Sequence, residues 1–162
     1  MRPVPILAAV LLAASLAACS KPAEQSSGTQ APAAAAPAMS DEEKAKVLAA
    51  LPAPYNTADL ANGEAKFALC QSCHTVQEGG ANMTGPNLHG VFGRKTASVA
   101  EFKYSDALKG ANFVWEPHHL DEWLTKPQDF LPGTKMTFPG LSDAKDRTDV
   151  IAYLMIESGY RP

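Results

Sequence analysis

The chain has 162 residues, a length that accommodates one modest domain with appendages. Its formal net charge at pH 7 is −3, from 14 lysines and arginines against 17 acidic residues. Because nucleic-acid-binding proteins carry an excess of basic residues, this balance excludes nucleic acid as an expected partner. The chain also has no glycine-rich phosphate loop and no Ser-His-Asp order, so its chemistry has to come from the cysteines.

Residues 1–18 have the pattern of an export signal, in which Arg2 precedes an apolar run that leads through small residues to Cys19. The run is short for a membrane span, which needs about 20 apolar residues, although an uncleaved anchor helix is an alternative. The ending LAAC resembles the lipobox of bacterial lipoproteins, which implies that Cys19 is lipid-modified. An ordinary cleaved signal with an incidental cysteine is the other alternative. We therefore expect residues 1–18 to be a lipoprotein signal peptide.

Residues 19–56 are expected to form a lipid-anchored flexible tether. Residues 20–38 are rich in Ser, Pro, Gln and Ala and have no large apolar side chain to bury. A short helix is expected near 40–51, where Ser40 and Glu43 form a capping box and Pro52 stops the helix. Whether this helix packs on the domain is left open by the sequence.

Residues 57–162 have the pattern of an all-α domain. Helical patterns run through TADLANGEAKFALC at 57–70, HHLDEWLTKP at 118–127 and SDAKDRTDVIAYLMIESG at 142–159, and no segment alternates with a period of two. The connecting loops are long and rich in glycine, which side-chain packing alone does not explain. A group other than side chains is therefore expected to fill the middle of the domain.

The stretch CQSCH at 70–74 indicates which group this is. A thioredoxin-like dithiol would follow a strand in a βαβ pattern, which is missing here, and a structural zinc site would need a second ligand pair. A disulfide between Cys70 and Cys73 would leave His74 without a role. The remaining interpretation is one covalently attached haem c, with both thiols bound to the porphyrin and His74 as an axial iron ligand.

The second axial ligand decides the function, because an open iron binds small molecules whereas a thioether makes a raised-potential electron carrier. Met136 is the best candidate, since Pro132, Gly133 and Pro139 make its loop rigid. The other methionines of the mature chain, Met39, Met83 and Met155, are expected in the tether, a loop and the core. The histidines His89, His118 and His119 are alternatives, but each is more simply a surface or loop residue.

Three blocks closely resemble class I cytochromes c of mitochondria and related bacteria. They are GPNLHGVFGRKT at 85–96, PGTKMTF at 132–138 and RTDVIAYL at 147–154, and their order and spacing match that family over residues 57–158. The resemblance implies the cytochrome c fold, with three main helices and long loops around a covalently attached haem. It also implies Cys70 and Cys73 as attachment points, with His74 and Met136 as the iron ligands.

The same resemblance implies roles for other residues. The carbonyl of Pro86 should accept the second N–H of His74 and so fix the ring. Arg94, Tyr104, Trp115 and Thr134 should lie near a haem propionate, because buried aromatics with one polar group exclude water and still donate a hydrogen bond. The pocket lining should include Leu88, Trp123, Leu124, Phe138 and Leu154.

Departures from the family pattern concern charge. The lysines that ring the haem edge in mitochondrial relatives are replaced here by Leu69, Gln128, Asp129, Ser142 and Asp143, while Lys135 remains. Residues 60–162 carry ten cationic and twelve acidic side chains, a balance of −2 before haem. Long-range steering toward an acidic partner should therefore be weak.

We expect a monomeric, monohaem electron carrier, not an enzyme, anchored by lipid on the periplasmic side of a bacterial membrane. Its expected partners are a quinol–cytochrome c oxidoreductase and a terminal oxidase. An electron acceptor for a periplasmic dehydrogenase is an alternative, as is a peroxide- or gas-binding haem protein, against which Met136 argues.

Overall fold

The computed structural model describes residues 39–161, and the expected signal peptide and Cys19 lie outside this range. The helices are α1 (Asp41–Ala50), the 3-10 turn η1 (Tyr55–Thr57), α2 (Leu60–Phe67), α3 (Asp106–Gly110), α4 (Pro117–Thr125), α5 (Pro127–Phe130) and α6 (Ala144–Glu157). Within residues 39–161 the only β pairing is an isolated bridge between Lys95 and Val114. The all-helical prediction is therefore confirmed.

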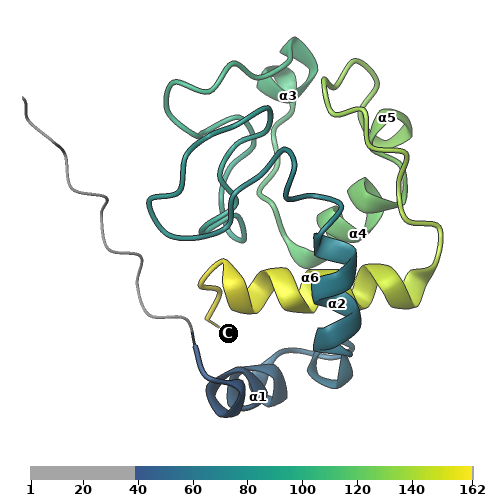
Figure 1. Ribbon diagram of the computed structural model, residues 1–162. Helices are drawn as coiled ribbons and strands as arrows, with labels where there is room; N and C mark the ends of the chain where they lie inside the picture. Colours follow the sequence, from purple (N-terminus) through teal and green to yellow (C-terminus); the bar gives the residue numbers. More distant parts are fainter. Residues whose placement is uncertain (1–38, 162) are drawn as a thin grey trace, which may run out of the picture. The chain divides into compact units, whose positions relative to one another are not determined.

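Helices α2 and α6 cross at the centre of the fold (Figure 1), and α4 also packs against α6, where Asp121 pairs with Arg147. The crossing is close because Gly63 has no side chain: a Cβ atom there would lie 2.8 Å from the carbonyl carbon of Asp149 and from Cβ of Tyr153. One turn further on, the rings of Phe67 and Tyr153 pack at a centroid distance of 5.5 Å. Helix α6 supplies seven of the fourteen buried residues of the hydrophobic core, among them the fully buried Ile151 and Met155.

Helix α1 has the capping box that its sequence suggests, with the Ser40 side chain and amide both bonded to Glu43. It packs on the domain, a question that the sequence left open. Lys44 forms an ion pair with Glu157 of α6 at 2.6 Å, and Leu51 is only 3% exposed in the core. The packed part of the chain therefore begins before Thr57, the expected start of the domain.

Capping side chains begin three of the helices, and a glycine follows the last one. Asp59, Ser105 and Asp143 each accept a backbone N–H at the start of α2, α3 and α6. Gly159 follows α6 with a φ of 82°, a left-handed conformation that glycine adopts without strain. None of the helices within residues 39–161 is long and apolar enough to cross a membrane.

Candidate haem-binding site

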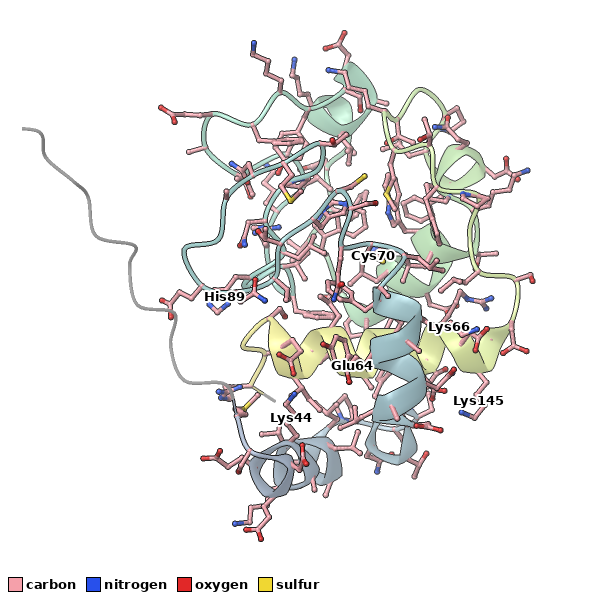
Figure 2. All side chains as sticks on the ribbon, viewed as in Figure 1. Lys44, Glu64, Lys66, Cys70, His89 and Lys145 are labelled. Atoms are coloured by element: carbon pink, nitrogen blue, oxygen red, sulfur yellow. The ribbon has the colours of Figure 1, made fainter. Side chains whose placement is uncertain are left out.

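The CQSCH residues leave α2 and form a turn of their own. The amide of His74 donates to the carbonyl of Cys70 at 2.9 Å, as does the amide of Cys73 at 3.0 Å. Figure 2 shows Cys70 just beyond the end of α2, away from Lys66 and Glu64. Burial raises the pKa of the Cys70 thiol to about 11, and the nearby Cys73 adds to the effect. The free thiol of Cys70 is therefore protonated at neutral pH.

The imidazole of His74 is held in one orientation. Its Nδ1–H donates to the carbonyl oxygen of Pro86 at 2.7 Å, as the sequence comparison with the family implies. Burial lowers the pKa of His74, the bond to Pro86 opposes this shift, and Arg94 lowers the pKa further. The neutral ring that results has Nε2 free as a lone-pair donor, which is the state in which histidine ligates a metal.

Gly85 makes room for this ring. A Cβ atom at Gly85 would collide with the imidazole of His74, and its nitrogen Nδ1 would lie 2.6 Å away. Gly85 is buried, and its amide donates to the carbonyl of Cys73 at 2.8 Å. The loop thus lies directly against the imidazole and holds it through a second contact besides Pro86.

The loop at 87–96 is tied together by Arg94. Its guanidinium donates to the carbonyls of His89 and Asn87, both at 3.1 Å, and burial lowers its pKa. Tyr104 is buried, and its hydroxyl accepts the amide N–H of Val99 at 3.4 Å. Of the four residues expected near a propionate, Arg94 and Tyr104 therefore each have a partner within the protein that fixes their position.

Aromatic rings form one wall of the domain. Trp123 is buried and meets Trp115 at a centroid distance of 5.3 Å in an edge-to-face arrangement. Phe130 packs against Trp123 at 5.9 Å. Large apolar side chains that are only partly buried gather against the same core, among them Leu88, Leu108, Trp115, Met136 and Phe138.

Met136 lies in a loop that hydrogen bonds from Gln128 hold in place. The Gln128 side-chain amide donates to the carbonyls of Thr134 at 2.9 Å and Met136 at 2.7 Å. The hydroxyl of Thr134, which is buried, accepts the amide of Met136 at 3.4 Å. Sequence reasoning missed this role of Gln128, because a side chain that serves backbone carbonyls leaves no pattern of its own.

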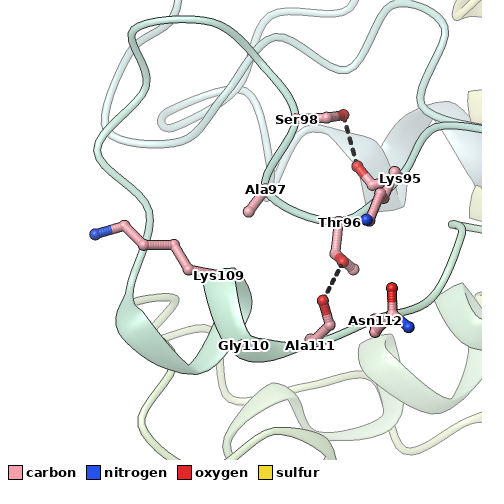
Figure 3. Close-up of a pocket in the computed structure, with 8 residues that line it drawn as sticks. All are labelled: Lys95, Thr96, Ala97, Ser98, Lys109, Gly110, Ala111 and Asn112. Carbon is pink, nitrogen blue, oxygen red and sulfur yellow. Dashed lines mark hydrogen bonds between the residues drawn. The ribbon is translucent and has the colours of Figure 1, made fainter.

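A separate surface hollow of about 380 Å³ lies beside α3. Its lining consists of Lys95, Thr96, Ala97, Ser98, Lys109, Gly110, Ala111 and Asn112 (Figure 3). The hydroxyl of Thr96 donates to the carbonyl of Ala111 at 2.8 Å, which ties the two sides of the hollow together. None of the candidate haem residues lines this hollow.

The residues present fit a covalently bound haem. Two thiols lie one turn apart, a neutral imidazole with a fixed ring follows them, and Gly85 provides a contact that a side chain would block. Two other methionines lie where the sequence analysis expects them. Met155 is fully buried in α6, as expected for a core residue, and Met83 is 46% exposed, as expected for a loop residue. Met136 therefore remains the proposed thioether ligand.

Comparisons with known proteins agree with this chemistry. The family model for cytochrome c matches residues 60–156. Cytochrome c of Kluyveromyces lactis is 41% identical over 106 residues, which are 65% of this chain and 96% of that protein. The cytochrome c-type cyt cy of Rhodobacter capsulatus is 50% identical over 99 residues, 60% of this chain and 49% of its own length.

Among solved structures, cytochrome cH from Methylobacterium extorquens aligns with a TM-score of 0.55 and 44% sequence identity. The alignment covers 59% of this chain and 96% of that one. The family match spans more than half of the chain and includes the CQSCH turn, the Met136 loop and all of α6 except its last residue. The chain therefore belongs to the cytochrome c family of electron carriers, which bind haem c covalently and are not enzymes.

Proposed function

We propose that the protein is a lipid-anchored monohaem cytochrome c that carries single electrons between membrane respiratory complexes on the periplasmic side. Electrons would arrive from a quinol–cytochrome c oxidoreductase and leave to a terminal oxidase. The observation that carries the proposal is the bond from His74 Nδ1–H to the carbonyl of Pro86, which leaves Nε2 free to ligate iron. Membership of a family of electron carriers supports it.

In this proposal Cys70 and Cys73 attach the haem, while His74 and the Met136 sulfur ligate its iron. When bound, the haem supplies a metal centre that gains and loses one electron. Gln128 keeps the Met136 loop in place through two hydrogen bonds, so that the sulfur moves little when the charge of the centre changes. The other side chains that we propose at the haem are Pro86, Leu88, Arg94, Tyr104, Trp115, Trp123, Thr134 and Phe138.

Charge around the site supports weak electrostatic steering. Lys126 pairs with Asp129 at 2.8 Å, so its charge is largely offset. Lys135 donates to the backbone carbonyls of Lys103 and Tyr104, at 3.1 and 3.4 Å. We therefore propose that confinement near the membrane, through a lipid on Cys19, replaces long-range attraction as the means of bringing the carrier to its partners.

The test compares the full chain with its Cys19→Ala variant in the parent bacterium after deletion of the native gene. Wild-type protein is expected in the membrane fraction, where it supports oxygen uptake driven by quinol. The variant is expected in the soluble periplasmic fraction, with slower uptake. If wild-type protein is also recovered as soluble, the anchor is wrong; if membranes without the protein respire equally fast, the respiratory role is wrong.

The same membranes test the charge argument. Reoxidation of the reduced protein by the terminal oxidase should change less than about threefold between low salt and physiological ionic strength, since few unpaired cations flank the site. A drop of tenfold or more would indicate steering by a charged docking surface and would contradict the role assigned to the anchor.

A further inference from the structure

The start of α4 carries a cluster of metal-binding side chains that the haem proposal does not use. Glu116, His118 and His119 each offer one ligand atom, and these three atoms all lie within 4.8 Å of one another. Glu116 and His118 are exposed to solvent, while His119 is half-buried. The chain has four histidines, of which these two are adjacent, so half of its imidazoles meet at one place.

The spacing within the cluster suits a metal ion. Nδ1 of His118 lies 3.3 Å from Oε2 of Glu116. Two ligand atoms that each bind a tetrahedral Zn²⁺ at about 2.0–2.1 Å are themselves about 3.3–3.4 Å apart, so the separation of this pair matches that of two ligands on one ion. The rings of His118 and His119 lie with centroids 3.9 Å apart and planes tilted by 40°, so the second imidazole lies beside the first.

The backbone of the cluster and the ring of His119 are held in place before any ion binds. Pro117 occupies the first position of α4 and restricts the backbone between Glu116 and His118. The ring of His119 packs on Phe113 at a centroid distance of 4.7 Å. Its Nδ1 is buried and has no hydrogen-bond partner among the described residues, so the structure leaves one polar atom of the cluster unsatisfied.

Glu116 is directed toward His118 and not toward its own helix. It occupies the N-cap of α4, yet its carboxylate accepts no backbone N–H there, unlike the N-cap side chains of α2, α3 and α6. The positive end of a helix disfavours a cation, but the Glu116 carboxylate lies at that end and offsets it. Further negative charge comes from Glu122, which lines a surface hollow together with His118.

We infer that Glu116, His118 and His119 form a surface site for one divalent transition-metal ion of the class that prefers imidazole nitrogen, such as Zn²⁺ or Cu²⁺. The site is separate from the iron ligands His74 and Met136. The ring of Phe113, against which His119 packs, also meets Trp115 at 4.9 Å, so the ion would adjoin the aromatic wall of the proposed haem pocket.

Zinc titration of the untagged holoprotein by calorimetry tests this inference. We expect one equivalent of Zn²⁺ to bind near neutral pH. Loss of one ligand in His118→Gln should weaken binding by about tenfold or more, because even outer-shell changes at metal sites weaken affinity by about 10–100-fold. Glu116→Gln should weaken binding as well, and His89→Gln, which changes the histidine outside both sites, should leave it unchanged.

Thermal unfolding provides a second readout that a misfolded variant cannot mimic. Zinc should raise the melting temperature of wild type and of His89→Gln, since an ion that binds only the folded state stabilises it. It should raise the melting temperature of His118→Gln less than that of wild type, while that variant keeps its circular dichroism spectrum. No zinc binding by wild type, equal affinity in His118→Gln, or a loss of binding in His89→Gln would each overturn the inference.

Discussion

The carboxylate of Asp149 in α6 accepts the backbone N–H of Asp59, the N-cap of α2, at 3.0 Å. It also accepts a hydrogen bond from the Asn62 side-chain amide at 2.7 Å and forms an ion pair with Lys145. Asp149 is only 1% exposed, so these three partners replace its water. Figure 2 shows Lys145 and Lys66 on the same side of the helix crossing. A buried acid thus joins the two helices that position the CQSCH turn.

We expect Asp149→Asn to lower the free energy of unfolding by about 2–3 kcal/mol, because an amide group brings a donor to a site where three donors already converge. Circular dichroism in denaturant measures the change. Asp146→Asn is the control, since Asp146 pairs with Lys66 in a more solvated position and should matter less. Equal losses in the two variants would contradict the assigned role of Asp149.

The effect of Asp149 should depend on pH. Burial alone would raise the pKa of Asp149, but the bonds from Lys145, Asn62 and the amide of Asp59 outweigh it and hold the pKa below the usual value. The contribution of a carboxylate with a lowered pKa is complete above its unfolded pKa of about 3.9 and is lost as pH falls through the folded pKa. The stability difference between wild type and Asp149→Asn should therefore shrink below about pH 4. A difference that grows on acidification would contradict this sign.

Gly63→Ala tests the closeness of the α2–α6 crossing. The new methyl group would meet the backbone of Asp149 and Cβ of Tyr153, so the helices have to move apart, at a cost of about 2–3 kcal/mol in the free energy of unfolding. Gly110→Ala, at the end of α3, is the matched control because a Cβ there meets nothing within 4 Å. An unchanged stability in Gly63→Ala would mean that the crossing has more room.

Helix α1 should be held by apolar burial more than by charge. Leu51→Ala is expected to lower the free energy of unfolding by about 2–4 kcal/mol, because Leu51 is buried in the core. Lys44→Ala breaks a surface ion pair with Glu157 and should cost less than about 1 kcal/mol. Chemical denaturation of both variants decides the order, and the reverse order would contradict the packing argument.

Gln128→Ala should loosen the Met136 loop without changing the helices. The variant loses two hydrogen bonds to the carbonyls of Thr134 and Met136, each worth about 1 kcal/mol, so an added ligand such as imidazole should replace the methionine about tenfold faster. Stopped-flow absorbance of the ferric protein measures this rate. Gln71→Ala, an exposed change within the CQSCH turn, serves as control. Equal rates for the two variants would remove Gln128 from the proposed ligand loop.

The sequence predicts the parts of this protein whose chemistry demands fixed residue types. Covalent attachment requires two cysteines at close spacing with histidine next, so Cys70, Cys73 and His74 can be found without a structure. The helices at α4 and α6 follow from apolar periodicity and from caps such as Asp143. The ligand and propionate roles that the family resemblance implies stay predictions.

Other features depend on contacts between distant segments and leave no local signal. Gln128 resembles any exposed polar residue until its amide is found against the 134–136 loop. Helix α1 packs on the domain through Leu51 and Lys44. No residue within α1 itself is buried, so its sequence shows no apolar stripe that would predict this packing. In the sequence Asp149 is one acid among many. Its partner, the backbone N–H of Asp59, lies 90 residues away, so no local pattern reveals the hydrogen bond.

The most direct test of the electron-carrier account is addition of carbon monoxide to the reduced protein, with absorbance spectra of both redox states. We expect a low-spin spectrum that carbon monoxide leaves unchanged in wild type, and ready binding in Met136→Ala, because the thioether is proposed to close the iron opposite His74. Prompt binding by wild type, or a low-spin spectrum and potential that survive in Met136→Ala, would contradict the account.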